Sequence, residues 1–235
     1  MSKYIRKFVT KTFGKKNTIN ILKHIAGSRI SEAPLDDIRS NGERFVEYPW
    51  ILRNLNLEKG KILDVGCYGS FFSLLLASQG FEVWGIDLKE YEWSSPNFKF
   101  IKGDIRSANL PVKFFDRLIM VSTLEHIGVS PEEPRILDNS GDVQAIKNMA
   151  KSLKDDGSIL LTVPYGKASV VKGQRIYDAK KFNEMFKSLK IVKKDFFIDR
   201  NGIWLPSTEG EVGKIVYKNV NAVCKGIACL KLCKR

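Results

Sequence analysis

The feature that most constrains the fold is a series of short apolar segments, each followed by a glycine or an acid. Residues 61–65, 81–87, 98–102 and 115–123 have strand character, and residues 72–78 have helical character up to Gly80, a residue that commonly ends helices. The alternation continues with helices at 142–153 and 179–189 and strands at 158–164, 191–198 and 226–232. Strands that alternate with helices predict an α/β fold, with a mostly parallel sheet covered on both faces.

Acids and glycines stand at the ends of the first three predicted strands. In such sheets, ligands bind outside the carboxyl ends of the strands, where the strand order reverses. Gly66 lets a ligand approach the backbone, and Asp64 beside it can attract an ammonium group. Asp87 can accept two hydrogen bonds from a ribose diol. Asp104 can accept a hydrogen bond from an adenine amino group. Ribose, adenine and an amino acid together describe S-adenosylmethionine (SAM).

Two other interpretations compete with this one. A single aspartate at a strand end more often caps a turn or a helix, but three at successive strand ends are more specific. A dinucleotide fold also places an acid at the second strand end. Its fingerprint, G-x-G-x-x-G, is not supplied by Gly66-Cys67-Tyr68-Gly69. The combination therefore favours SAM over NAD.

Several motifs resemble the class I SAM-dependent methyltransferases over roughly residues 45–200, and they are Ile62-Leu63-Asp64-Val65-Gly66-Cys67, Val83-Trp84-Gly85-Ile86-Asp87, Lys102-Gly103-Asp104-Ile105, Ser122-Thr123-Leu124-Glu125-His126 and Leu160-Leu161-Thr162-Val163-Pro164. The resemblance implies a Rossmann-like sheet of seven strands, the last antiparallel. It also implies a cofactor site at Asp64, Gly66, Cys67, Gly69, Asp87, Leu88, Asp104, Ile105 and Ser122. The similarity is greatest to a bacterial and archaeal subgroup associated with cell-surface glycan synthesis. Tyr68 and Ser70 depart from the family's D-x-G-x-G-x-G.

The candidate catalytic residues lie after the fourth and fifth strands. Methyl transfer to a hydroxyl group benefits from a base with a pKa near neutrality, and His126 stands where this fold places its acceptor pocket. Glu125 is a second candidate, although Ser122-Thr123-Leu124-Glu125 also fits a helix-capping box. Tyr165 is a third candidate for the acceptor pocket. The alternative interpretation is that its ring packs at the edge of the core. The segment after the fourth strand lacks N/D-P-P-Y/F, so methylation of an exocyclic base amine is disfavoured.

Positive charge is concentrated at the ends of the chain. Residues 1–24 contain seven basic residues and residues 214–235 contain six, and neither segment contains an acid. These thirteen charges equal the net charge of +13, so the residues between them are neutral overall. Residues 1–45 are predicted to form a basic amphipathic extension, and residues 46–235 the methyltransferase domain. The face formed by Tyr4, Ile5 and Phe8 suits a helix on an anionic membrane, or a helix packed on the domain.

Three functions follow from this reading. The first is a methyltransferase that acts at oxygen on a small molecule or a glycan, with lipid-linked glycans included. The second is an RNA methyltransferase whose basic ends hold phosphates, although the neutral middle of the chain disfavours nucleic acid. The third is a SAM-binding protein without methyl transfer.

No segment is long and apolar enough to span a bilayer, no secretory signal is evident and the four cysteines show no disulfide or metal spacing. We therefore expect a cytoplasmic protein, with a peripheral position at the inner membrane face as a variant, and no metal.

Overall fold

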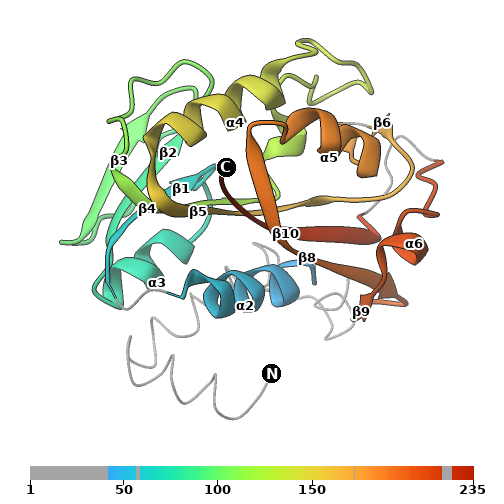
Figure 1. Ribbon diagram of the computed structural model, residues 1–235, viewed down its shortest axis with the longest axis horizontal. Coiled ribbons are helices and arrows are strands. Elements are labelled where there is room, and N and C mark those ends of the chain that lie inside the picture. The colour runs from blue at the N-terminus through green and yellow to red at the C-terminus, as the bar shows by residue number, and fades with distance from the viewer. Residues whose placement is uncertain (1–41, 57–58, 172, 219–223) are drawn as a thin grey trace.

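The computed structural model describes residues 42–56, 59–171, 173–218 and 224–235 (Figure 1). The basic amphipathic segment predicted at residues 1–24 lies outside the described residues. The strands of the main sheet are β1 (Lys61–Val65), β2 (Glu82–Asp87), β3 (Phe98–Lys102), β4 (Phe115–Val121), β5 (Leu153–Pro164), β8 (Leu189–Arg200), β9 (Ile203–Ser207) and β10 (Gly226–Lys234). The helices are α2 (Arg44–Leu55), α3 (Phe72–Ser78), α4 (Gly141–Ser152), α5 (Ala179–Met185) and α6 (Glu209–Val212), with a 3-10 turn η2 (Leu124–His126).

The main sheet has the order β3-β2-β1-β4-β5-β10-β8-β9. The first five strands in this order are parallel, and β10 is antiparallel to both of its neighbours, β5 and β8. The predicted α/β sheet with an antiparallel C-terminal strand is therefore confirmed. Among the described residues the sheet has eight strands rather than the expected seven, because β9 pairs antiparallel with β8 at the edge.

Helices cover both faces of the sheet, with α4 and α5 on one face and α2 and α3 on the other (Figure 1). The first face buries Ala145, Ile146 and Met149 of α4 against Leu118 and Leu161. On the second face, a separate cluster of buried side chains joins both helices to the sheet, and it includes Trp50, Ile51, Leu55, Phe72, Leu76, Ile119 and Leu160. The central strands are consequently buried on both faces, as a parallel sheet requires.

Some element boundaries differ from the sequence-based expectation. Helix α2, which the sequence did not predict at these bounds, begins at Arg44 and contains Pro49 in its interior. A proline there removes one helical hydrogen bond, and the burial of Trp50, Ile51 and Leu55 offsets this loss. Strand β5 begins at Leu153, well before Ser158. A further pair of short strands, β6 (Ser169–Val171) and β7 (Gln174–Ile176), forms a separate two-stranded sheet.

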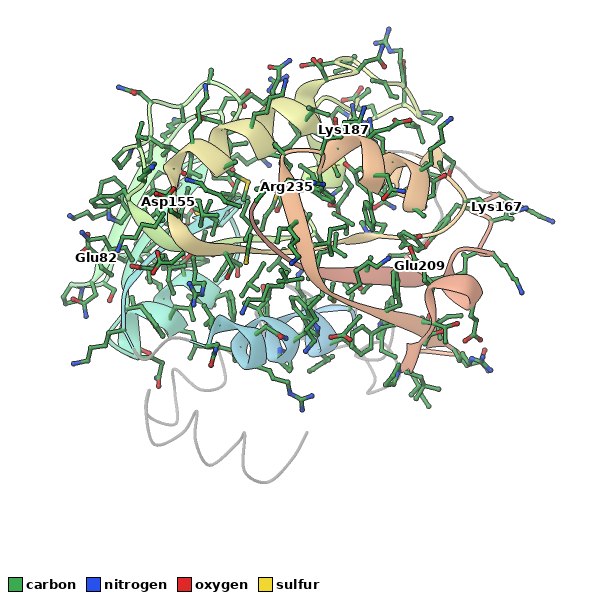
Figure 2. The ribbon with its side chains drawn as sticks, in the orientation of Figure 1. Glu82, Asp155, Lys167, Lys187, Glu209 and Arg235 are labelled. Carbon is green, nitrogen blue, oxygen red and sulfur yellow. The ribbon has the colours of Figure 1, made fainter. Side chains whose placement is uncertain are left out.

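Charged groups gather at the periphery of the molecule, as the labelled Glu82, Asp155 and Lys187 illustrate (Figure 2). All four cysteines are free, and Cys67 and Cys229 are buried. Within the described ranges, no helix combines the length and apolar character that crossing a bilayer requires.

Candidate active site

A cleft of about 450 Å³ opens at the carboxyl edge of β1, β2, β3 and β4. The strand order reverses on either side of β1, so this is the switch point at which open α/β sheets bind ligands. Its size falls within the range of small-molecule and cofactor sites. The cleft is lined by Val65, Gly66, Ile86, Asp87, Leu88, Gly103, Asp104, Ile105, Arg106, Thr123, His126, Ile127, Gly128, Val129, Leu137 and Asp138.

The turn after β1 forms the floor of the cleft at Gly66. This residue has φ +80°, and a Cβ there would lie 2.2 Å from Thr123 Oγ1, so only glycine fits. Tyr68, where the family has a glycine, is 48% exposed, with the Lys89 ammonium 4.9 Å from its ring centroid. The Ser70 hydroxyl accepts a hydrogen bond from Phe72 N at the start of α3. Neither residue lines the cleft, so the altered turn leaves it open.

The Asp87 carboxylate is held in a fixed orientation at the end of β2. One oxygen accepts a hydrogen bond from Tyr68 N and the other from Lys89 N, both at 3.0 Å. A carboxylate has about four acceptor positions, so each oxygen retains one for a further donor. Asp87 and its neighbour Leu88 both line the cleft, as the sequence interpretation requires of a ribose-binding acid.

Four predicted cofactor residues lie beside the cleft rather than in its lining. Asp64 is buried beneath the turn, where its carboxyl accepts a hydrogen bond from Ser73 Oγ at 2.6 Å and burial raises its pKa to about 6. Cys67 is buried against Gly85. The remaining two are Gly69, which has φ +71°, and Ser122, whose hydroxyl points to the opposite side of β4. Asp64, Cys67 and Gly69 lie in or directly before the turn, Ser122 follows β4, and none of the four lines the cleft.

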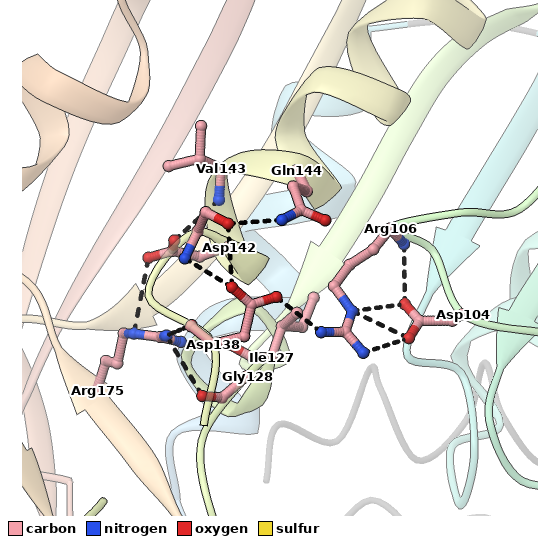
Figure 3. A network of polar contacts seen from close by, with 10 residues as sticks. Asp104, Arg106, Ile127, Gly128, Asp138, Asp142, Val143, Gln144 and Arg175 are labelled. Atoms are coloured by element: carbon pink, nitrogen blue, oxygen red, sulfur yellow. Dashed lines mark hydrogen bonds and ion pairs between the residues drawn. The ribbon is translucent and has the colours of Figure 1, made fainter. Parts of the chain in front are cut away.

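Asp104 lines the cleft, but its carboxylate already has a partner. Arg106 donates to both oxygens, and its Nη1 also donates to Asp138 Oδ2 at 3.0 Å (Figure 3). The hydrogen bonds from Arg106 hold the pKa of Asp104 below its usual range. An adenine amino group would therefore share this carboxylate with a guanidinium. Ile105 lies beside it as an apolar wall.

His126 is the last residue of η2, which follows β4, and it lines the cleft. Asp87, at the end of β2, lines the same cleft. Its Nδ1 contacts the carbonyl oxygen of Gly173. Because a carbonyl only accepts, Nδ1 carries the proton and Nε2 is left with a free lone pair in the neutral ring. Desolvation lowers the pKa of His126 from its ordinary value of 6.5. The imidazole is thus neutral at pH 7 and able to accept a proton.

Glu125 is buried next to a polar cluster formed by α2 and the sheet. Its side chain is 1% exposed, its Oε1 lies 3.9 Å from His126 Nε2 and its Oε2 has no hydrogen-bond partner. Glu47 of α2 accepts from Ser122 Oγ at 2.5 Å and from Thr162 Oγ1 at 2.7 Å. Thr123 makes no side-chain cap bond, and Ser122 is committed to Glu47, so the capping-box alternative is wrong.

Burial raises the pKa of Glu125 to about 8, which makes stability depend on pH. Between the unfolded value near 4.5 and the folded value, the folded state retains a proton that the unfolded state has released. The stabilisation is therefore present at low pH and lost as the pH rises toward 8. We expect Glu125→Gln to match the parent protein at pH 5 and to exceed it by roughly 2–4 kcal/mol at pH 9. Urea unfolding at both pH values measures this difference, and parallel pH profiles for the two proteins would contradict it.

Tyr165 is turned away from the cleft. Its side chain is 2% exposed, and its hydroxyl donates to Glu209 Oε1 of α6 at 2.9 Å (Glu209 is labelled in Figure 2). Burial, followed by the neighbouring Glu209 carboxylate, raises the pKa of Tyr165. The ring packs against Phe182 and Phe196 at the edge of the core. The alternative reading of Tyr165 as a core-edge aromatic therefore describes its position better than a catalytic role.

Sequence reasoning missed four polar residues that shape this region, namely Glu47, Arg106, Asp138 and Arg175. Arg106 directly follows the predicted Asp104-Ile105 pair, and an arginine two residues from an acid at a strand end was a usable signal. Glu47 and Arg175 gave no such signal, because their partners are 37 to 115 residues away.

Comparison with known proteins points to one family. The family model described as a methyltransferase domain matches residues 38–192, which is more than half of the chain. A curated relative, the ubiquinone biosynthesis O-methyltransferase of Rickettsia akari (strain Hartford), is 26% identical over 117 residues, which cover 46% of this chain and 42% of that protein. The chain spans less than half the length of the curated relatives it matches.

Solved structures share the fold of the described residues. The N-methyltransferase NodS from Bradyrhizobium japonicum WM9, in complex with S-adenosyl-l-homocysteine (SAH), has a TM-score of 0.57 at 15% identity, covering 92% of this chain and 97% of that one. The [4+2]-cyclase SpnF has a TM-score of 0.59 at 16% identity, covering 92% of each chain. At these identities the likeness concerns the fold, and chemistry has to be argued from the site.

Proposed function

This chain belongs to the methyltransferase domain family, and we propose that it is a SAM-dependent enzyme that methylates a hydroxyl oxygen of a small-molecule acceptor. The observation that carries the proposal is the composition of one cleft. Asp87, which suits a ribose diol, and His126, which suits the deprotonation of a hydroxyl, both line it.

The cleft residues fit the parts of the cofactor. Asp87 keeps acceptor positions for the ribose hydroxyls, and Ile86, Leu88 and Ile105 supply apolar surface for a purine ring. Gly66 offers backbone without a side chain for the amino-acid end. When bound, SAM supplies a methyl group that is already activated, so the protein's main task is to align the acceptor and exclude water.

His126 would act as the general base. Its Nε2 is the unprotonated nitrogen of the neutral ring and can take the acceptor's hydroxyl proton as the oxygen attacks. Glu125 Oε1 lies 3.9 Å from this nitrogen, but with its pKa raised to about 8 the carboxyl is mostly protonated at pH 7, so it lies beside the base as a neutral group. Glu125 Oε2 is buried without a hydrogen-bond partner, and Glu125 does not line the cleft. We assign Glu125 a supporting role and Tyr165 none in the reaction.

The acceptor class we propose extends to glycans and lipid-linked sugars, which present hydroxyl groups. A peripheral contact of residues 1–24 with an anionic membrane would suit a lipid-linked acceptor. The same basic segment is the basis of the RNA alternative, and the altered glycine turn is the basis of the non-catalytic one. An open cleft and a free base nitrogen favour methyl transfer over SAM binding alone.

An acceptor screen tests the proposal. The purified protein is incubated with SAM and with phenols, free and lipid-linked sugars, primary amines or total RNA, and release of SAH is measured. We expect turnover with a hydroxyl compound and a stoichiometric product methyl ether. Turnover only with amines would overturn the oxygen assignment, and turnover only with RNA would overturn the small-molecule acceptor. SAM binding without turnover on any acceptor would favour the non-catalytic alternative.

A further inference from the structure

The β6–β7 pair reaches the segment that carries His126, although it belongs to a different sheet. Strand β7 packs against η2, and the carbonyl of Gly173, just before β7, accepts the hydrogen bond from His126 Nδ1. Two residues further on, Arg175 is 4% exposed. A buried guanidinium is costly unless its donors are satisfied, so its partners indicate what it organises.

Arg175 donates hydrogen bonds to the backbone at both ends of the segment that follows His126. Its Nη1 donates to Ile127 O, and its Nη2 donates to Asp138 O at 2.6 Å, with Gly128 O at 3.5 Å (Figure 3). Its Nε lies 3.8 Å from the buried Asp142 carboxylate at the start of α4. One planar fork thus ties together the two ends of the loop between η2 and α4.

The carbonyls that Arg175 holds belong to one wall of the cleft. Ile127, Gly128 and Asp138 line the cleft, whereas Arg175 does not. The wall is tightly built, because Gly128 has φ +75° and a Cβ there would lie 2.6 Å from Asp138 O. The Asp138 side chain continues the network to Arg106 and from there to Asp104 on the opposite wall.

We propose that Arg175 is a positioning residue that fixes both the far wall of the cofactor cleft and the imidazole of His126. It touches neither the reacting groups nor the cleft, and it acts through the carbonyls of Ile127, Gly128 and Asp138. The inference rests on the proposed function, since it takes this cleft as the cofactor site. A lysine keeps the charge but lacks the planar fork, so its single nitrogen cannot reproduce the contacts that two separate guanidinium nitrogens make to Ile127 O and Asp138 O.

Arg117 supplies a matched control, because it lies near the amino end of β4 and the cleft lies at the carboxyl ends of the strands. Its guanidinium also holds three backbone carbonyls, those of Leu55, Asn56 and Asp116, at 2.8, 3.3 and 2.7 Å. Arg117→Lys therefore removes a comparable set of hydrogen bonds without approaching the cleft. Both variants are expected to lower the melting temperature.

The experiment compares Arg175→Lys and Arg117→Lys in the full chain by two readouts. Calorimetric titration with SAH should show a dissociation constant about tenfold higher for Arg175→Lys and unchanged for Arg117→Lys. NMR titration of the ring protons follows His126, which is readily assigned because His24 is the sole other histidine. Only Arg175→Lys should lower the pKa of His126 further, because the loosened segment weakens the hydrogen bond to Gly173 O, which favours the protonated ring, while the side chain is already 56% exposed. Glu125 and Arg44, which also act on this imidazole, are the same in both variants.

Equal SAH affinities and equal His126 titrations in the two variants would overturn the proposal. If the parent protein binds no SAH, the proposed function fails, and the His126 titration alone still decides the role of Arg175. If Arg175→Lys does not fold, Asp142→Asn offers a milder test. It weakens the ion pair that orients Arg175 and should shift both readouts in the same direction by a smaller factor, and no shift would count against the proposal.

Discussion

Replacing His126 with alanine is expected to lower the rate of methyl transfer by about 10²–10⁴-fold, the usual contribution of a general base. The affinity for SAM should change little, because the proposed cofactor contacts lie at Asp87, Leu88 and Ile105. The measurement is the release of SAH with an acceptor found in the screen, alongside calorimetric titration with SAM. A loss of both activity and SAM binding would mean that His126 shapes the cofactor site rather than the reaction.

The pH dependence of the parent enzyme gives a second test of the same role. The base works only when it is neutral, so kcat/KM should rise with pH through the pKa of His126 and level off above it. Desolvation lowers this pKa below 6.5, so the rise should occur on the acid side of pH 6.5 and the plateau should include pH 7. The His126→Gln variant should lack this rise. A rise that persists in the variant would assign the titration to another group.

Replacing Asp87 with alanine is expected to raise the dissociation constant for SAM by about 10²–10⁴-fold. Two hydrogen bonds from a ribose diol to a carboxylate are charge-assisted, and each contributes about 1.5–3 kcal/mol. The variant also loses the acceptors for Tyr68 N and Lys89 N, which orient the turn beside the cleft. Calorimetric titration with SAM, and separately with NAD, measures the effect. We expect no response of the parent protein to NAD.

Asp199→Ala is the control for this variant. Asp199 lies on β8, far along the sheet order from β1, and accepts a hydrogen bond from Gly202 N at 2.7 Å, so its loss also disturbs a turn. Its effect on SAM affinity should be negligible. SAM affinity that is unaltered by Asp87→Ala would place the cofactor outside the cleft described here.

The sequence was most informative where each strand has strong local character. The strand ending at Val65, the helix from Phe72 and the strand ending at Asp87 lie where they were expected, because apolar runs and the glycine after them act locally. The edge at which the acids meet also follows from the topology of a parallel sheet. The two strands and the residues directly after them supply Val65, Gly66, Ile86, Asp87 and Leu88 of the cleft lining.

Contacts between distant residues explain most of what the sequence did not reveal. The role of Glu47 depends on Thr162, 115 residues away, and that of Arg175 depends on carbonyls 37 to 48 residues earlier. Strand β9 was missed because Ile203 and Leu205 are exposed at a sheet edge and lack the alternation of a half-buried strand. The direction of single side chains could not be predicted either. No neighbouring residue in the sequence indicates that Ser122 contacts Glu47 or that Tyr165 contacts Glu209.

The position of β10 has a consequence for how the chain assembles during synthesis. This strand lies between β5 and β8, so β8 and β9 have no place in the main sheet until residues 226–234 have been made. Until then, β5 presents an unpaired apolar edge while the half that holds the cleft is already complete in sequence. Such an edge can pair with other nascent chains. A chain in which β10 has not yet docked therefore exposes an edge of β5 that favours aggregation, and docking of β10 covers it.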